Sequence, residues 1–254
     1  MWIVQTEQLH FHQASDFSDT YEGKFPQFIK DVYQAHWGDN FEDGKEFIQS
    51  TRDITFLNCW HKNSYESAAM WEQYSTAGKG IAIKTTRKKL LKSINYDLPE
   101  KSITARDLDV IYIDFEKGYD DLEEDQLDKL DESIDIDRSG METSQLYRFK
   151  RREYDYENEL RICLQFNYLI DGDDDSGQES PFELKKSESD YGPSEIPVDS
   201  YLYLPVAVDE LIDEIYVKPN MDEWVVNSIK EALDSREDLD LSSADVTRSD
   251  LDEF

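Results

Sequence analysis

Hydrophobic and polar residues alternate in several separate stretches of the chain. The pattern is clearest in "DITFLNCW" (53–60), "GIAIKTT" (80–86), "DVIYIDF" (109–115), "ENELRICLQFNYLI" (157–170) and "LIDEIYVKP" (211–219). A repeat of two places successive side chains on opposite faces of a sheet. Each of these stretches therefore predicts a β-strand.

Helical patterns lie between the predicted strands. In "SYESAAMWEQYSTAG" (64–78), apolar residues recur every three or four positions, which predicts a helix. Asn63 and Glu66 have the spacing of a capping box at its start. Two further helices are predicted over 87–94 and 221–233.

The order of these elements predicts an α+β fold with a mixed or mainly antiparallel sheet and packed helices. The connections vary in length, and no regular alternation of strand and helix emerges that would predict a parallel βαβ sheet. A chain of 254 residues is long enough to bury one substantial core. We therefore expect a single α+β domain over residues 1–234.

Acidic segments interrupt this domain and follow it. Residues 118–140 and 171–200 are rich in Asp, Glu and turn-forming residues and poor in aliphatic periodicity. We expect both to be acidic surface insertions. The acidic tail at 235–254 has the same character and is expected to be flexible.

The net charge of −31 arises from 58 acidic and 27 basic residues. Such a surface repels nucleic acids and anionic membranes, so direct binding to either is not expected. Dense carboxylates keep a protein hydrated in concentrated salt, which favours a halophilic protein, with DNA mimicry as the alternative explanation. Only Cys59 and Cys163 are present, and no secretory leader or membrane span is recognised, which predicts a soluble cytoplasmic protein.

Residues 51–100 are the exception to this acidity. They contain five acidic and eight basic residues, so the rest of the chain carries a net charge of −34. A segment exempt from the acidic background is either buried or committed to an anionic ligand. The predicted helix at 64–78 and its flanking strands are therefore the first place to look for a functional site.

One face of that predicted helix combines aromatic and polar residues. At 100° per residue, Glu66, Ser67, Met70, Trp71 and Tyr74 fall within one arc. A stripe of this kind is normally part of a core. A carboxylate against aromatic packing is also a candidate general acid or base, because desolvation disfavours its ionised form. Glu66 is thus a candidate catalytic residue as well as a capping-box partner.

The stretch "EYDYENELRIC" (153–163) holds the second set of candidates. On a strand, Glu157, Glu159 and Arg161 share one face. One interpretation is a solvated ladder of paired charges. The other is a cleft in which the two glutamates stabilise an oxocarbenium-like centre while Lys150, Arg151 and Arg152 hold phosphates.

A metal site is not expected. Cys59 and His61 could point the same way from one strand, with Cys163 as a third ligand, but the paired spacing typical of zinc ligands is absent. No glycine-rich phosphate loop and no nucleophile elbow is recognised either.

Four stretches in this order resemble the bacterial and archaeal domain-of-unknown-function family twenty-nine-seventy-one. They are "LHFHQASDFSDTYEG" (9–23), "FLNCWHKNSYESAAMWEQYSTAGKGIAIKTT" (56–86), "FKRREYDYENELRI" (149–162) and "LIDEIYVKP" (211–219). The family's motifs correspond here to Phe17, Asp19, Glu22 and Gly23, to Cys59, Met70, Trp71, Tyr74 and Gly80, and to Glu157, Glu159 and Arg161. This chain would be a highly acidic, haloarchaeal version of the family.

The resemblance implies a site more than an activity. Its polar motifs, Asp19/Glu22, His61/Glu66 and Glu157/Glu159/Arg161, are far apart in sequence but lie on elements expected to meet in one core. Converging ionisable groups at a sheet edge are a candidate active site.

Two functions from different classes fit these residues, so whether the chain is an enzyme stays open. The first is an enzyme for a nucleotide-like or glycosidic substrate, with ADP-ribosyl transfer or NAD cleavage as the most concrete form, by analogy with the E-x-E strands of ADP-ribosyltransferases. Glu157, Glu159, Arg161 and Glu66 would then be catalytic, and Trp71, Tyr74, His61, Asp19, Glu22 and Arg151 would bind the substrate. The second is a non-catalytic binding or regulatory module of a defence or stress system, with a small molecule or a protein as partner.

Overall fold

The structure is a computed structural model that describes residues 2–37, 51–75, 79–94, 103–131, 143–166, 201–242 and 245–253. The chain divides into two compact units. Unit 1 comprises residues 1–10, 63–97 and 203–254, and unit 2 comprises residues 11–62 and 98–202. Helices accompany mainly antiparallel strands, so the predicted α+β fold is confirmed. The single domain expected over residues 1–234 stays a prediction.

The main sheet of unit 2 is antiparallel. Its strand order is β4 (Ile103–Asp109), β7 (Glu159–Phe166), β2 (Thr55–His61) and β1 (Gln8–Gln13), and a fifth strand, β8 (Tyr201–Pro205), follows β1 in the same sheet. The boundary between the units falls inside β1. Strand β7 lies between β4 and β2, and all of its residues are buried. The interpretation of its charges as a solvated ladder was therefore wrong, because sheet neighbours and covering segments exclude water from both faces.

A two-stranded parallel pair and two helices complete the hydrophobic core of unit 2. The pair consists of β5 (Ile111–Ile113) and β6 (Phe149–Arg151). Apolar residues from this pair meet α2 (Gln27–Trp37) and α6 (Glu124–Asp131) in one cluster, in which the rings of Phe28 and Phe149 pack edge to face.

Short 3-10 helices make the connections in unit 2. They are η1 (Ala14–Asp16), η3 (Thr51–Ile54), η4 (Tyr119–Asp121), η5 (Thr143–Arg148) and η6 (Arg152–Glu157). The last of these leads directly into β7 and carries Glu157, which sequence analysis had placed on the strand itself.

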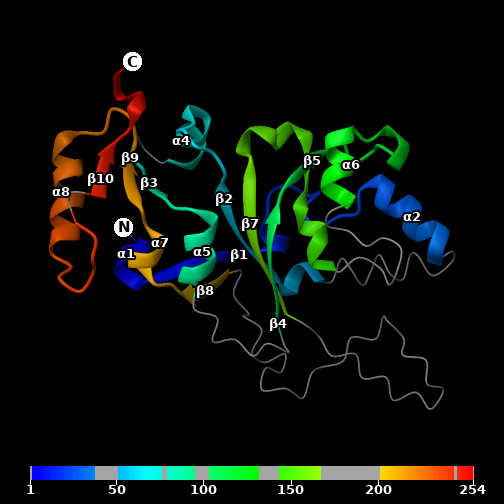
Figure 1. Ribbon diagram of the computed structural model, residues 1–254, viewed down its shortest axis with the longest axis horizontal. Coiled ribbons are helices and arrows are strands. Elements are labelled where there is room, and N and C mark those ends of the chain that lie inside the picture. The colour runs from blue at the N-terminus through cyan, green and yellow to red at the C-terminus, as the bar shows by residue number, and fades with distance from the viewer. Residues whose placement is uncertain are drawn as a thin grey trace, which may run out of the picture. The chain divides into compact units, whose positions relative to one another are not determined.

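Unit 1 is built on a three-stranded sheet in the order β10 (Val246–Arg248), β9 (Glu214–Val217) and β3 (Ile81–Lys84). Helix α8 (Glu223–Asp234) connects β9 to β10, which pair in parallel, and it lies beside them in Figure 1. The other elements are α1 (Trp2–Thr6), α4 (Ala68–Tyr74), α5 (Arg87–Ser93), α7 (Val208–Leu211) and η8 (Asp250–Glu253). Among the described helices, none has the length and apolar character needed to cross a membrane.

The helix expected at 64–78 is shorter in the structure and begins differently. Helix α4 covers Ala68–Tyr74, and its N-cap is Ser67, whose hydroxyl accepts a hydrogen bond from the Met70 amide at 3.4 Å. The predicted capping box of Asn63 and Glu66 is wrong, because the Glu66 carboxylate binds other groups, described below.

The acidic segments are only partly described. Within the insertion expected at 118–140, Leu122 and Leu130 are buried in the core cluster of unit 2, so residues 118–131 contribute to the core. The insertion expected at 171–200 lies outside the described residues. The tail from residue 235, which we expected to be flexible, contains strand β10, and Leu241 and Val246 supply enough apolar surface to be buried there.

Candidate functional site

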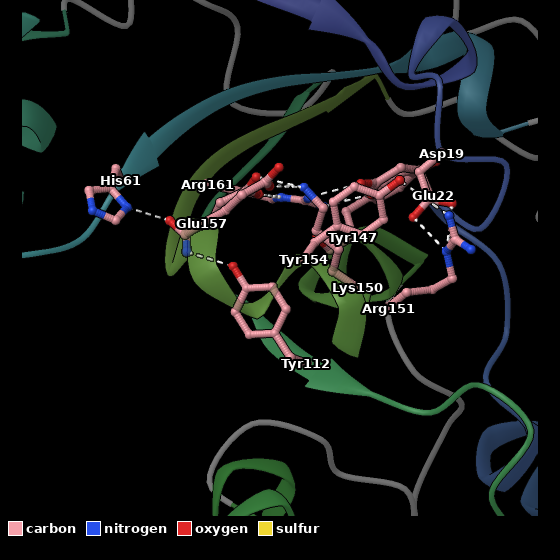
Figure 2. Close-up of polar contacts among 11 residues, drawn as sticks. Asp19, Glu22, His61, Tyr112, Tyr147, Lys150, Arg151, Tyr154, Glu157 and Arg161 are labelled. Carbon is pink, nitrogen blue, oxygen red and sulfur yellow. Dashed lines mark hydrogen bonds and ion pairs between the residues drawn. The ribbon is translucent and has the colours of Figure 1, made fainter. Parts of the chain in front are cut away.

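Arg161 is the centre of a buried charge network in unit 2 (Figure 2). Its guanidinium donates to both carboxylate oxygens of Glu22, at 2.7 and 2.9 Å, from Nη1 and Nη2. Its Nε donates to Glu159 Oε2 at 2.6 Å, and Nη1 also donates to the Tyr147 carbonyl at 2.8 Å. Bidentate pairing of this kind is the strongest geometry available to arginine.

Lys150 extends the network to a third carboxylate. From β6, its ammonium binds Glu159 Oε1 at 2.7 Å and also the carboxylate of Glu157. Glu159 therefore bridges the two cations. Arg161, Glu157 and Glu159 are only 0%, 2% and 5% exposed, so the network is sealed from solvent.

The network contains three carboxylates but only two cations. As a result, the pKa values of Glu157 and Glu159 differ widely. Burial raises the pKa of Glu157 to about 7, and the nearby Glu159 carboxylate adds to the rise. Burial also works against the ionised form of Glu159, but Arg161 and Lys150 outweigh it and lower the pKa of Glu159 to about 2. Glu157 is thus the network's proton acceptor, while Glu159 stays ionised.

Asn158 sets the geometry between the two glutamates. Its φ of 38° is left-handed, a conformation that asparagine tolerates better than most residues, and it ends η6 before β7 begins. The backbone on either side is also held: His61 Nδ1–H donates to the Glu157 carbonyl at 2.6 Å, and the Glu159 amide donates to the Tyr112 hydroxyl at 2.9 Å.

Gly23 allows Glu22 to reach Arg161. Its φ is +69°, and a Cβ at this position would lie 2.7 Å from the ring of Tyr147. Only glycine satisfies both conditions without displacing the ring. Upstream, Asp19 accepts a hydrogen bond from the Tyr21 amide at 3.0 Å, the geometry of an Asx turn.

Asp19 holds a second arginine of unit 2, Arg151, with an N–O distance of 3.1 Å. The Arg151 guanidinium also lies over the rings of Tyr21 and Tyr154, 5.0 and 5.3 Å from their centroids. Its side chain is 34% exposed, so this pair is open where the Arg161 network is closed. Glu22 and Asp19, three residues apart, thus hold two arginines in different environments.

Arg151 borders a half-open cavity of about 530 Å³. The cavity is lined by Tyr21, Ile113, Asp114, Phe115, Glu116, Arg151, Arg152, Glu153 and Asp155. None of the sealed residues Glu157, Glu159 and Arg161 is part of this lining. The two features are adjacent along the chain, because Lys150 and Arg151 are consecutive on β6.

The structure brings seven of the ten predicted site residues into unit 2, namely Asp19, Glu22, His61, Arg151, Glu157, Glu159 and Arg161. Glu66, Trp71 and Tyr74 belong to unit 1. A cleft shared by the two sets therefore stays a prediction.

Within unit 1, Glu66 is a structural tie. Its carboxylate accepts hydrogen bonds from Trp71 Nε1, Ser249 Oγ and the Asp250 amide, each at 2.7 Å. These bonds fix the start of α4 to the segment that follows β10. Trp71 is buried, whereas Tyr74 is exposed.

The basic residues around the predicted helix face acidic partners in unit 1. Lys84 pairs with Glu214 and Lys92 pairs with Glu210, both at 3.0 Å, and Lys89 pairs with Asp213. Three lysines of the basic segment are therefore paired with carboxylates of segment 210–214. Their charge is compensated within the protein, without an anionic ligand.

Sequence analysis missed the tyrosines that complete the site in unit 2. Tyr21, Tyr112 and Tyr154 stack on or hydrogen-bond to its charged residues. The position of Tyr21 between Asp19 and Glu22 could have identified it from the sequence, because a residue between two carboxylates in a turn lies close to both. Among the described residues, no group of His, Cys, Asp or Glu is arranged to hold a metal ion.

Comparison with known proteins supports the resemblance over part of the chain. A family model described as "Protein of unknown function (DUF2971)" matches residues 70–162. That range contains Glu157, Glu159 and Arg161, whereas Asp19 and Glu22 lie before it. Neither the curated proteins nor the solved structures gave a match. Over residues 70–162 the chain is thus similar to a family whose description assigns no activity.

Proposed function

We propose that the chain is a non-catalytic binding module whose ligand occupies the cavity beside Tyr21 and Arg151. The observation that carries the proposal is the contrast between the cavity and the charge network. The glutamates of the E-x-E motif are sealed, and both contact cationic side chains, so they are placed to stabilise the fold. The cavity is open, and its volume is in the range of ordinary ligand sites, roughly 300–1,000 Å³.

Residues of the charge network are close in sequence to residues of the cavity wall. Strand β6 carries Lys150 of the network and then Arg151 of the cavity wall, and η6 carries Asp155 of the wall and then Glu157 of the network. Arg151 is therefore one position from the buried Lys150, and Asp155 is two positions from the buried Glu157. Such support fixes a binding site before its ligand arrives.

A second candidate function is the enzyme acting on a nucleotide-like or glycosidic substrate, with ADP-ribosyl transfer or NAD cleavage as its specific form. One observation favours it: neighbouring carboxylates with pKa values pushed apart, to about 7 and about 2, are the usual arrangement of an acid and an ionised partner. In this hypothesis Glu157 moves the proton and Glu159 stabilises the positive centre. Substrate would have to displace the cover over both glutamates.

The enzyme candidate is tested by incubating the full chain with NAD, with and without candidate acceptor proteins, and measuring nicotinamide. Release that is lost in Glu159→Gln, with the fold retained by circular dichroism, would establish the enzyme and overturn the non-catalytic proposal. No release over a range of salt concentrations is the result we expect.

The binding module is tested with a blocking variant. Glu153 is exposed at the cavity wall, so Glu153→Trp places an indole at the cavity without removing a buried contact. The matched control is Glu231→Trp on the exposed side of α8 in unit 1. In a thermal-shift screen of cationic, neutral and anionic metabolites, we expect a ligand that raises the Tm of the wild type and of the control but not of Glu153→Trp. Equal shifts in all three proteins, or no shift at all, would contradict the proposal.

A further inference from the structure

We infer that the cavity binds an organic cation, an ammonium or guanidinium group carried on an apolar body. This inference rests on the proposed binding function and names its ligand class. The lining of the cavity contains both apolar side chains and carboxylates, which match the apolar body and the cationic group of such a ligand.

The carboxylates of the lining have no ion-pair partner among the residues that the structure describes. Four line the cavity: Asp114, Glu116, Glu153 and Asp155. Within the described chain, no ion pair joins any of them to a basic side chain. Asp114 accepts one hydrogen bond, from the Glu116 amide at 3.0 Å, which leaves its charge uncompensated.

The two arginines of the lining are already neutralised from outside the cavity. Arg151 is paired with Asp19 at 3.1 Å, and Arg152 is paired with Glu123 at 3.2 Å. Neither Asp19 nor Glu123 lines the cavity. Among the described residues, the lining therefore carries four carboxylates without an ion-pair partner, and their field repels anions and attracts cations.

The apolar part of the lining comes from the core cluster. Ile113 and Phe115 are buried members of that cluster, and Tyr21 packs against it with its ring edge to face with that of Phe115, at 5.0 Å between centroids. The Tyr21 ring already lies 5.0 Å from both Lys24 Nζ and the Arg151 guanidinium, so it is an aromatic group that attracts cations within this fold. A methylene chain or a planar guanidinium would contact this surface favourably.

A metal ion does not fit the same residues. A metal needs several oxygen ligands converging on one point, and no group of His, Cys, Asp or Glu among the described residues converges in that way. The four carboxylates come from two segments of the lining, 114–116 and 153–155, of a cavity of about 530 Å³, which suits positive groups separated by an apolar spacer. Free polyamines and the lysine or arginine side chains of a peptide share this chemistry.

The test is calorimetric titration of the full chain with spermidine and, separately, with a short arginine-rich peptide, at about 0.15 M salt and above to screen diffuse attraction. The variant Glu153→Gln/Asp155→Asn removes two exposed charges of the lining. The control Glu231→Gln/Glu237→Gln removes two exposed charges of unit 1, so both proteins have the same net charge. Thermal unfolding confirms that both variants fold.

We expect at least one probe to bind the wild type and the control equally and the lining variant about tenfold more weakly, from two lost ion contacts. Binding of spermidine identifies a small-molecule source of the cation, and binding of the peptide alone identifies a protein side chain. Equal weakening in the control and the lining variant would overturn the inference, because the attraction would then be nonspecific. Inorganic phosphate binding that Glu153→Trp blocks would also overturn it, while leaving the proposed binding module intact.

Discussion

Arg161 and Arg151 are held by carboxylates only three residues apart in sequence, yet they serve different purposes. Arg161 is completely buried and bonded to Glu22 and Glu159, whereas Arg151 pairs with Asp19 at the wall of an open cavity. An arginine–carboxylate pair in a sequence motif therefore cannot be assigned a role until the burial of both side chains is known. In unit 2 the sealed pair is part of the buried interior, and the open pair borders the cavity that we propose as a ligand site.

The largest expected effect comes from breaking the sealed network. Arg161→Met leaves Glu22 and Glu159 buried without their principal cation, and we expect a loss of about 3–5 kcal/mol in the free energy of unfolding. Urea denaturation of the full chain measures it. The same substitution in a Glu22→Gln background is expected to cost less, because one of the stranded charges is gone. A loss no greater than that of a surface pair would refute the structural role of the network.

The next effect tests the uneven charge of that network through pH. The pKa of Glu157 is raised from 4.5 to about 7, so the folded chain binds a proton that the unfolded chain has released. This group's contribution to stability is therefore present below pH 4.5 and is lost as the pH rises from about 4.5 to about 7. Glu159, with its pKa lowered to about 2, acts oppositely and loses its contribution as the pH falls from about 4.5 to about 2.

Glu157→Gln isolates the first of these contributions. We expect the free energy of unfolding of the variant to depend less steeply on pH than that of the wild type between pH 4.5 and 7, measured by urea denaturation at several pH values. The other titrating groups contribute to both proteins and cancel in the difference. Parallel pH curves for the two proteins would mean that Glu157 is ionised throughout this window.

Arg151→Met, at the open pair, should cost less than Arg161→Met. Water can reach the Asp19–Arg151 pair because the arginine is one-third exposed, so we expect a loss of about 1–3 kcal/mol. The variant also makes the cavity more negative, and spermidine is expected to bind it at least as tightly as the wild type. Weaker spermidine binding by a folded Arg151→Met would show that Arg151 itself contacts the ligand.

We expect the smallest loss of stability from an exposed ion pair of unit 1, with which the losses at the buried and half-buried pairs can be compared. Lys89→Ala removes the partner of Asp213 at the surface, and we expect a change of about 0–1 kcal/mol that shrinks further in concentrated salt. Urea denaturation at low and high salt measures it. A salt-independent loss as large as that of Arg161→Met would show that exposure is not what separates these pairs.

Much of the fold could be predicted from local patterns. The alternation of "DITFLNCW" and "GIAIKTT" corresponds to β2 and β3, and the helix expected at 221–233 corresponds to α8 at 223–234. Strand β4, "ITARDLD", was missed, because its polar residues hide the alternation and its place comes from pairing with β7. A partner strand distant in sequence leaves no local signal.

The site could be predicted as a set of residues but not as an arrangement. The E-x-E-x-R spacing correctly placed Glu159 and Arg161 on one face, and Arg161 Nε indeed bonds Glu159. Burial excludes one of the two interpretations of this face, the solvated ladder of paired charges. Nothing in the spacing announces that Glu22, 139 residues upstream of Arg161, supplies the missing carboxylate.

The discontinuous composition of the units has a consequence for synthesis on the ribosome. All segments of unit 2 lie within residues 11–202, so it is complete in sequence while later residues are still being translated. Unit 1 needs residues 203–254, including β9 and its parallel partner β10, to join residues 1–10, which are synthesised well before them. At about 5–20 residues per second, its first segment waits on the order of tens of seconds for its last. Unit 2 can therefore fold during translation before unit 1 is complete. The incomplete unit 1 is exposed for longer, so a chaperone has more time to bind it.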